Sequence, residues 1–353
     1  MKLFRNLVVY GLILLSGLGL KAQDIHFSQF YMSPLNLNPA MTGVSNCTSR
    51  IIGNFRNQWA PVLKSNAYNT YSLSYDQKMP VGRYDYFGIG GALWGDVAGT
   101  HNFGTTEGKL SFSYSKKMGG YRKKAHFLVI GAEGGFARRG IDTDKYIWPD
   151  YSNIEERIDN PSFYFGDVSA GLLWFSVFDE YTNFYIGAAF HHLNQPNQSF
   201  KRSWVDTTSS TILRTIDDNN NLYSKVTIHG GGQFEIQPRI SLLPYFVGFI
   251  QGPYTQLNLG TSISFALGSS RLNKQSFQIG AYYRLVSQYQ SKPYSDALIL
   301  TTRFEYQNLG FGLSYDATIS GLRAASSATN SLELSVIYNI CGPEHRGIYC
   351  PRF

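Results

Sequence analysis

Hydrophobic and polar residues alternate along most of the chain. The stretch 108–116, GKLSFSYSK, sets Leu110, Phe112 and Tyr114 against lysine and serine on the other side, and 277–285, FQIGAYYRL, follows the same scheme. A period of two is that of a β-strand, because successive side chains of a strand point to opposite faces of the sheet. One face of each predicted strand therefore meets an apolar medium, and the other meets water or a polar interior.

The alternation predicts fourteen strands. Several patterns last about nine to twelve residues, near the roughly 9–11 that a tilted strand needs to cross a membrane and longer than the ~5–6 of an ordinary sandwich strand. The number is even, as in single-chain bacterial barrels. The predicted strands are 50–58, 67–77, 85–96, 105–118, 125–138, 162–178, 181–194, 222–236, 239–250, 255–268, 274–286, 295–307, 309–319 and 330–341.

The connections between these strands also alternate, in length. Those after odd-numbered strands are mostly long, as at 139–161 and 195–221, whereas those after even-numbered strands are mostly short, as at 179–180 and 237–238. A barrel with a periplasmic N-terminus has long outward loops and tight inward turns in this order. A soluble β-sandwich, the alternative for the same period, gives no reason for the alternation. We therefore predict an all-β, transmembrane antiparallel β-barrel over residues 50–341.

Charged residues stand at polar-side positions inside several alternating strands. An isolated charge on a soluble strand is usually a solvated face, but a charge at mid-strand here fits a wet barrel interior. Tyr and Phe recur near predicted strand ends, as in 84–88 and 163–166. This is typical of the aromatic belts of membrane barrels, although a β-rich core also favours aromatics. The charges are Lys109, Glu133, Arg284, Arg303, Glu305, Asp316 and Glu333.

Residues 1–22 have the form of a secretory signal peptide. Lys2 and Arg5 precede 14 residues without a charge, and small Ala22 stands before Gln23 at the predicted cleavage site. The uncharged run is too short for a membrane-spanning helix, which needs about 20 residues. No cysteine follows it, so a lipoprotein anchor is not expected. We predict that the mature chain begins at Gln23.

The segment 23–49, between the cleavage site and the first strand, follows neither the helical nor the strand period. It carries many aromatic and aliphatic side chains that something must cover, and Pro34, Pro39 and Gly43 offer fixed turns. Wide barrels need a filled lumen. We expect the segment to fold inside the barrel as a plug or to lie across its periplasmic mouth. Its candidate plug or docking residues are Phe27, Phe30, Tyr31, Asn38, Pro39 and Ala40.

Composition narrows the class further. Aromatic residues make up 15% of the chain, and no long apolar run follows the signal, which excludes a helical membrane protein. Without Lys2, Arg5 and Lys21, 28 basic residues face 24 acidic ones, a net charge of +4. No basic run lies on a helical face, so nucleic acid is not expected as a partner.

The three cysteines are Cys47, Cys341 and Cys350. An odd count leaves at least one thiol unpaired within the chain, and an oxidising compartment permits one disulfide. The first and last strands of a closed barrel are neighbours, so Cys47 can bond to Cys341 or Cys350 across the closure seam. A local bond between Cys341 and Cys350, within the end of the last strand and the predicted periplasmic tail at 342–353, is equally feasible.

No catalytic, cofactor or metal site is predicted. The chain has no G-x-S-x-G, H-E-x-x-H or C-x-x-C motif. His191 and His192 are adjacent, so on a strand they point to opposite faces and cannot share a metal. Asp142, Asp144 and Asp150 of an acidic loop offer carboxylates, but their spacing matches no EF-hand, and a solvated loop explains them. We expect a protein that is not an enzyme.

Several blocks resemble one family of bacterial proteins. QDIHFSQFYMSPLNLNPAMTG (23–43), FRNQWAPV (55–62) and YNTYSLSYDQKM (68–79) are similar to the start of the PorP/SprF family of Bacteroidetes. The end, at 311–340 and in CPRF (350–353), looks like that family's closing strands and tail. The resemblance implies an integral outer-membrane barrel of the type IX secretion system in a Gram-negative bacterium. Its implied partners are membrane lipid, the secretion machinery and a secreted adhesin, whose export or attachment it supports, in some members for gliding motility.

A second resemblance leaves an alternative open. The tripeptide NPA at 38–40 looks like the hatch motif of FadL-type barrels, which implies a FadL-like or porin-like passive transporter of small solutes. Such a transporter conducts or binds a small ligand, whereas a docking barrel is plugged and silent. An outer-membrane enzyme needs an ordered polar constellation at the outer rim, which the sequence does not display. For docking, the expected contact regions are the loops 139–161 and 195–221 and the N-terminal segment.

Overall fold

The structure is a computed structural model, and it describes most of the chain. The predicted signal peptide, with its cleavage site between Ala22 and Gln23, lies outside the described residues, as does most of the predicted tail at 342–353. No helix among the described residues is long and apolar enough to cross a membrane. The described residues are 24–82, 84–120, 124–143, 154–158, 160–179, 181–206, 211–216, 220–268, 275–287, 292–321, 330–342 and 350.

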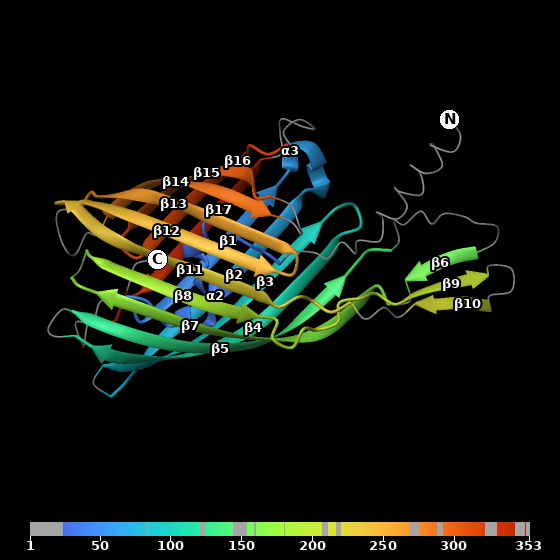
Figure 1. Cartoon of the computed structure of the whole chain (residues 1–353), viewed down its shortest axis with the longest axis horizontal. Coiled ribbons are helices and arrows are strands. Elements are labelled where there is room, and N and C mark those ends of the chain that lie inside the picture. The colour runs from blue at the N-terminus through green and yellow to red at the C-terminus, as the bar shows by residue number, and fades with distance from the viewer. Residues whose placement is uncertain are drawn as a thin grey trace.

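Fourteen antiparallel strands close into one barrel (Figure 1). Each predicted strand is present, so the predicted fold class is confirmed. The barrel strands are β1 (Ser49–Gln58), β2 (Tyr68–Val81), β3 (Asp85–Ala98), β4 (Phe103–Gly119), β5 (Ala125–Gly140), β7 (Ser162–Val177), β8 (Asn183–His191), β11 (Lys225–Gln237), β12 (Ile240–Gln251), β13 (Tyr254–Ala266), β14 (Gln275–Ser287), β15 (Tyr294–Tyr306), β16 (Leu309–Thr318) and β17 (Ser331–Ile340).

The closure seam joins the first and last of these strands. β1 pairs with β17 along its whole length, from Ser49 opposite Ile340 to Gln58 opposite Ser331. On the other side of β1, the antiparallel pairing with β2 is equally long. Because every strand has two neighbours, no strand edge of the barrel is left open, as a membrane-spanning sheet requires.

The two faces of the barrel wall differ in chemistry, as the alternation predicts. On β4, Leu110 and Phe112 point outward and are 62% and 54% exposed, while Lys109 and Ser111 are buried inside. Large apolar side chains are exposed in the same way around the whole wall. An outer face of this kind is stable only in an apolar medium, and the inner face forms a polar lining.

Two of the long connections contain strands of their own, where the sequence predicts only loops. β6 (Ile154–Ile158), β9 (Arg202–Asp206) and β10 (Thr211–Ile216) form a separate antiparallel sheet in the order β10, β9, β6. Figure 1 shows this sheet beyond one end of the barrel. We call that end the long-loop end and the opposite end the short-turn end. These strands are five or six residues long, too short for the alternation to stand out.

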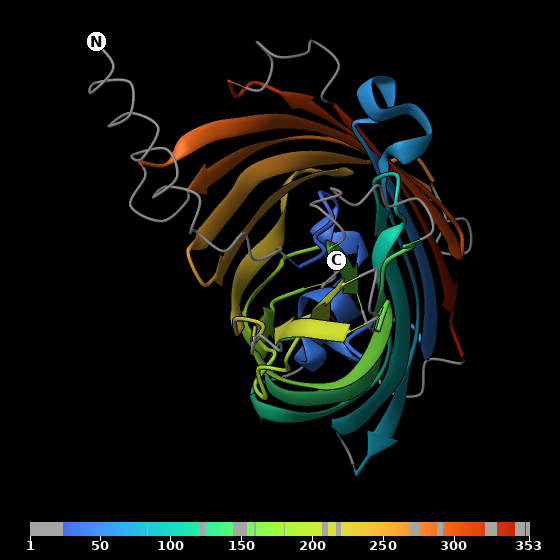
Figure 2. The same cartoon turned by 90° about the vertical axis from the view of Figure 1, so that its right-hand side faces the viewer.

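Short helical turns account for the rest of the regular structure in the part of the chain that the structure describes. α3 (Ala60–Leu63) and η3 (Lys64–Asn66) lie in the first long connection, whereas η1 (Phe30–Met32), α2 (Pro34–Leu37) and η2 (Pro39–Met41) lie inside the barrel. Figure 2, a view down the barrel, shows these N-terminal turns in the lumen. Proline opens α2 and η2, because its fixed φ suits the first helical position and its missing N–H has no partner there.

Candidate functional site: the plugged lumen

The N-terminal segment runs through the lumen from one end to the other. At the long-loop end, the carboxylate of Asp24 lies 3.2 Å from Nζ of Lys225, the first residue of β11. At the short-turn end, Nζ of Lys78 donates to the carbonyl of Ser45 at 2.7 Å. We call residues 24–46 the plug. Of the two expected placements, the structure has the one inside the barrel.

The middle of the plug is an apolar core. Phe30 and Tyr31 are almost completely buried, and the ring of Tyr31 stacks on Tyr245 of β12 at 5.2 Å between centroids. Phe30 meets Tyr245 and Tyr282 edge-on at 6.5 and 6.3 Å. Full burial of one such side chain stabilises by roughly 1.5–3 kcal/mol. The other buried apolar residues of the plug are Phe27, Met32, Leu35, Leu37, Ala40, Met41 and Val44.

Asn38 fixes the plug to the wall by hydrogen bonds. Its Nδ2 donates to the carbonyls of Leu172 and Ala188 at 3.0 and 3.2 Å and lies 3.0 Å from Nε2 of His229. Its Oδ1 accepts from the backbone N–H of Ala40 at 2.8 Å, which caps η2. Because Asn38 is fully buried, removing these partners would leave a costly unpaired amide.

Two glycines of the wall make room for this tripeptide. Gly131 of β5 and Gly171 of β7 are direct cross-strand partners. A Cβ at Gly131 would overlap the backbone of Pro39 and Ala40, and a Cβ at Gly171 would overlap the side chain of Asn38. The wall and the plug therefore approach each other at backbone distance, which only glycine allows.

The first residues of the plug meet charged groups instead. The backbone N–H groups of Ser28 and Gln29 donate to the two carboxylate oxygens of Glu333 at 2.7 and 2.8 Å. The Ser28 hydroxyl donates to Asp316 at 2.6 Å and accepts from Arg284 at 2.6 Å. All three charged side chains are nearly inaccessible to solvent, so these bonds form in a low-dielectric environment that strengthens them.

Arg56 of β1 completes this charged cluster. Its guanidinium donates to the His26 carbonyl at 3.0 Å and to the Ser28 hydroxyl at 3.1 Å, and it lies 3.2 Å from Asp316. The cluster therefore sets two arginines against the carboxylates of Asp316 and Glu333, with Asp296 3.6 Å from Arg284. Buried charges of this kind are tolerated only when they are paired and hydrogen-bonded.

Asp24 lies in a second charged group at the long-loop end. Its carboxylate is 3.0 Å from Nε2 of His192, whose Nδ1 is 3.0 Å from Asp167. Burial alone would lower the pKa of His192, but Asp24 and Asp167 outweigh it and raise the pKa to about 10. Burial alone would raise the pKa of Asp24, but Lys225 and His192 hold that pKa well below its usual value. Both groups are therefore charged at neutral pH.

The prediction that His191 and His192 face opposite sides is wrong. β8 ends at His191, and His192 takes a left-handed backbone with φ of 57°. As a result both rings point into the lumen, with His191 3.6 Å from Glu133 and His192 bonded to Asp24. A period of two holds only within a strand, and β8 ends at His191, whereas the predicted strand runs to residue 194.

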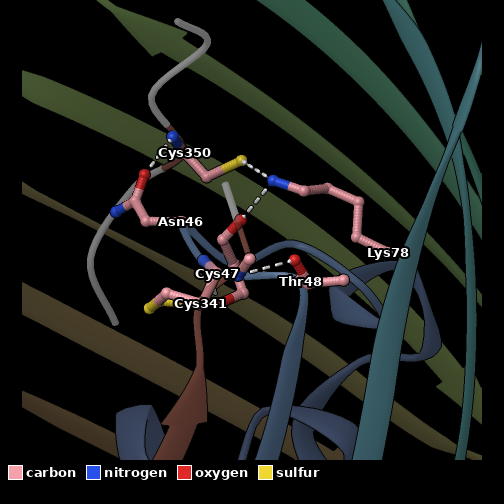
Figure 3. Close-up of a disulfide and its surroundings, with 8 residues drawn as sticks. Asn46, Cys47, Thr48, Lys78, Cys341 and Cys350 are labelled. Carbon is pink, nitrogen blue, oxygen red and sulfur yellow. Dashed lines mark hydrogen bonds between the residues drawn. A yellow bond between two sulfur atoms is a disulfide. The ribbon is translucent and has the colours of Figure 1, made fainter. Parts of the chain in front are cut away.

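A disulfide joins Cys47 to Cys341 at the short-turn end (Figure 3). It connects the residue that follows the plug to the residue that follows β17, across the closure seam. Cys350 is a free, buried thiol whose backbone N–H donates to Asn46 at 2.6 Å, and its sulfur lies 4.0 Å from Nζ of Lys78. Of the three pairings that the sequence left open, the structure has the first.

The Ca²⁺ alternative at the acidic loop concerns residues that the structure describes only in part. Asp144 and Asp150 lie outside the described residues. Among the residues that the structure describes, no three His, Cys, Asp or Glu side chains gather as metal ligands would.

Sequence reasoning did not single out Asp24, Arg56, His192 and Lys225 as partners. A signal was present for Arg56, because it is a charge at a polar-side position of the first predicted strand. The pairings themselves are not local: Ser28 and Glu333 are 305 positions apart. Only the order and register of the closed barrel bring them together.

A closed fourteen-strand barrel with an apolar outer face and a filled, polar-lined lumen is an integral outer-membrane protein. Residues 19–338 match the model of the family described as type IX secretion system membrane protein PorP/SprF. The chain belongs to this family, which the N-terminal and C-terminal blocks of the sequence predict.

Solved structures of several other barrels are similar in outline. The Pseudomonas putida toluene transporter TodX is 8% identical over 89% of this chain and 94% of its own, with a TM-score of 0.46. CdiB from Escherichia coli is 9% identical over 82% of this chain and 63% of its own, with a TM-score of 0.45. A mutant of the Rh. blastica porin is 8% identical over 83% and 99%, with a TM-score of 0.33. Likeness at this level carries no information on function. A comparison with curated proteins found no match.

Proposed function

We propose that this chain is a non-enzymatic docking barrel of the type IX secretion system. In this role it contacts the secretion machinery and supports the export or surface attachment of a secreted adhesin, and the adhesin serves gliding motility. Family membership supports the link to the machinery. The observation that carries docking rather than transport is the plug, which runs through the lumen from Asp24 to Ser45 and ends next to the disulfide at Cys47.

The proposal includes the orientation and processing of the chain. A signal peptide at 1–22 is removed, so that the mature chain starts at Gln23, directly before the first described residue of the plug. The long-loop end faces outward, and the short-turn end, with the tail at 342–353, faces the periplasm. The alternation of long and short connections supports this orientation, because outer-membrane barrels carry long extracellular loops and short periplasmic turns.

The adhesin contacts the long-loop end in this proposal. The sheet of β6, β9 and β10 projects beyond the barrel there (Figure 1). β9 lies between the other two strands, and within the described residues the sheet contains no fourth strand. A projecting sheet of this kind offers backbone N–H and C=O groups at its edges, and strand addition to such edges is a common way to bind an extended segment.

Deletion of the gene tests the proposal directly. Surface proteins of the deletion strain are labelled with an impermeant biotin reagent and compared with those of the strain complemented with the wild-type gene. We expect one surface adhesin to be lost and gliding to be impaired, with other surface proteins unchanged. If no surface protein is lost and uptake of a solute falls instead, the proposal is wrong, and the passive transporter becomes the explanation.

Conductance gives a second, independent measurement. The purified barrel in a planar lipid bilayer should show no steady ion current, because the plug runs through the lumen and packs against its wall. Matched bilayers with a general porin serve as the positive control. A stable open conductance in the wild-type protein would favour the transporter.

A further inference from the structure

Lys225 and His192 form a built cationic site at the long-loop end. Their side chains are 6% and 5% exposed, whereas the Asp24 carboxylate that they hold is 17% exposed. The cations are thus part of the wall, with Nζ of Lys225 5.0 Å from the ring centroid of Phe249. The carboxylate is the more accessible partner and belongs to the segment that enters the site.

The site would carry a net positive charge without Asp24. Asp167 lies 3.0 Å from His192 and balances it. Lys225 has Asp24 as the carboxylate partner within ion-pair distance in the described structure. Removing one partner of a buried ion pair leaves an uncompensated charge at high cost. A vacated site would therefore favour another carboxylate strongly.

The site also contacts the main chain on both sides of the carboxylate. The backbone N–H of Asp24 donates to Oε1 of Gln251 at 3.0 Å. Nζ of Lys225 donates to the carbonyl of Ile25 at 3.3 Å. The site thus binds an acidic side chain within a peptide, together with the backbone N–H of the acidic residue and the C=O of the residue that follows it.

We propose that Lys225, His192 and Gln251 form a binding site for an acidic residue of a passenger polypeptide, which Asp24 occupies until the passenger displaces it. The inference rests on the proposed docking function, because it assumes that a polypeptide reaches the long-loop end. Residues 24–29, which we call the strap, can leave alone. Apart from the buried ring of Phe27, the strap is held by hydrogen bonds and ion pairs, whereas the apolar core from Phe30 to Val44 and the disulfide hold the rest of the plug.

Peptide binding to the purified mature barrel in detergent tests this site. The probe is a fluorescent peptide with four consecutive glutamates, and the control probe has glutamines in their place. A tethered carboxylate competes at an effective concentration of about millimolar, so Asp24→Ala should bind the glutamate probe at least about tenfold more tightly than the wild type. The double variant Asp24→Ala, Lys225→Met should return binding to background. The glutamine probe should not respond to either change.

Three results would overturn the inference: Asp24→Ala binding no tighter than the wild type, tight binding that persists without Lys225, or equal tightening for the glutamine probe. Free glutarate separates a solute from a polypeptide as the source of the carboxylate. It should compete at least about tenfold more weakly than the peptide, since it lacks the flanking N–H and C=O. Equal competition would overturn the polypeptide assignment.

A second variant guards against misfolding. Heat-modifiable migration on a gel reports whether Asp24→Ala forms a barrel, and Asp24→Glu, which refills the site with a carboxylate, should keep wild-type affinity. If Asp24→Ala does not fold, His26→Cys in a Cys350→Ser background reports strap release in its place. Its maleimide labelling should speed up with the glutamate probe and not with the glutamine probe, and no difference would overturn the inference.

The two proposals fail separately. If no passenger docks but the peptide still binds, the proposed function and the passenger as occupant are wrong, and the carboxylate site itself stands. Intact docking with no effect of Asp24 on peptide binding would remove only this site.

Discussion

The two parts of the plug are held by different forces. From Phe30 to Val44 the plug is mainly buried apolar surface packed against the aromatic wall, with Asn38 hydrogen-bonded to that wall. The strap at 24–29, apart from the buried ring of Phe27, is bonded to charged side chains. Apolar burial responds little to salt or pH, while charged contacts respond to both. One short segment therefore combines a fixed anchor with a part that its environment can loosen, and the boundary between them falls at Gln29.

The largest effect is expected at Gly131 and Gly171, the two wall glycines that make room for the anchor, which is the part of the plug from Phe30 to Val44. Gly131→Val places side-chain atoms where the backbone of Pro39 and Ala40 lies, so we expect the anchor to be expelled and the lumen to open. The measurement is bilayer conductance, together with new protease cleavage between Asn36 and Met41. The matched control is Gly134→Val on the same strand, where the nearest atom is 3.9 Å away from the added Cβ. The control should show no conductance. If Gly131→Val shows none either, the absence of a side chain at position 131 is not needed to keep the plug in place.

The next effect concerns a single apolar side chain of the anchor. Leu35 is completely buried, so Leu35→Ala should lower the free energy of unfolding by about 2–5 kcal/mol, equally at low and high salt. The measurement is urea unfolding in detergent. Asn36→Ala is the control, since Asn36 is only partly buried and bonds to Ser33 and Ser72. If the loss of unfolding free energy in Leu35→Ala depended strongly on salt, it would contradict the view that apolar burial holds the anchor and charged contacts hold the strap.

The disulfide ties the anchor to the closure seam. Cys47 and Cys341 are 294 positions apart, so their bond restricts the unfolded chain. Replacing Cys341 by Ser should cost about 2–4 kcal/mol of unfolding free energy. We expect the cost to appear as a lower temperature of the heat-induced gel shift. Cys350→Ser removes a thiol outside the bond and should change that temperature much less, and equal shifts would contradict the assignment.

The smallest effect is the pH dependence of the strap. The folded-state pKa of His192, about 10, is above its usual 6.5, so its contribution is fully present below pH 6.5 and is lost as pH rises through 10. The pKa of Asp24 is lowered from 3.8, so its contribution is present above pH 3.8 and is lost only in stronger acid. The backbone amides of Ser28 and Gln29 should therefore lose protection against hydrogen exchange as the pH rises from 6.5 to 10, after correction for the intrinsic pH dependence of exchange. Asp24→Asn should flatten this change, and exchange in the anchor should not follow it.

The strands could be predicted because their signal is local. In β14 every second residue from Phe277 to Leu285 is apolar, and no distant residue is needed to read that pattern. The strands β6, β9 and β10 were not predicted, because they are short and face no lipid. The turn at His192 was not predicted, because the alternation of apolar and polar residues does not show that a residue after a strand has a left-handed backbone.

The path of the plug could be predicted only in part. Its apolar residues required a cover, and the barrel was the available one, so the burial of Phe27, Phe30, Tyr31, Pro39 and Ala40 follows from their chemistry, whereas that of the polar Asn38 does not. Their partners do not follow. Which wall residues meet Asn38 or Ser28 depends on strand register and on the diameter of the closed barrel, and neither is written in any short stretch of the chain.

The bond between Cys47 and Cys341 has a consequence for biogenesis. Its two sulfurs are 294 positions apart in the sequence, and the pairing of the last strand with the first holds them side by side. We therefore expect the oxidation of this pair to report the closure of the barrel. In pulse-chase samples quenched with an alkylating reagent, the fraction that resists modification counts finished molecules, and stalled intermediates keep both thiols.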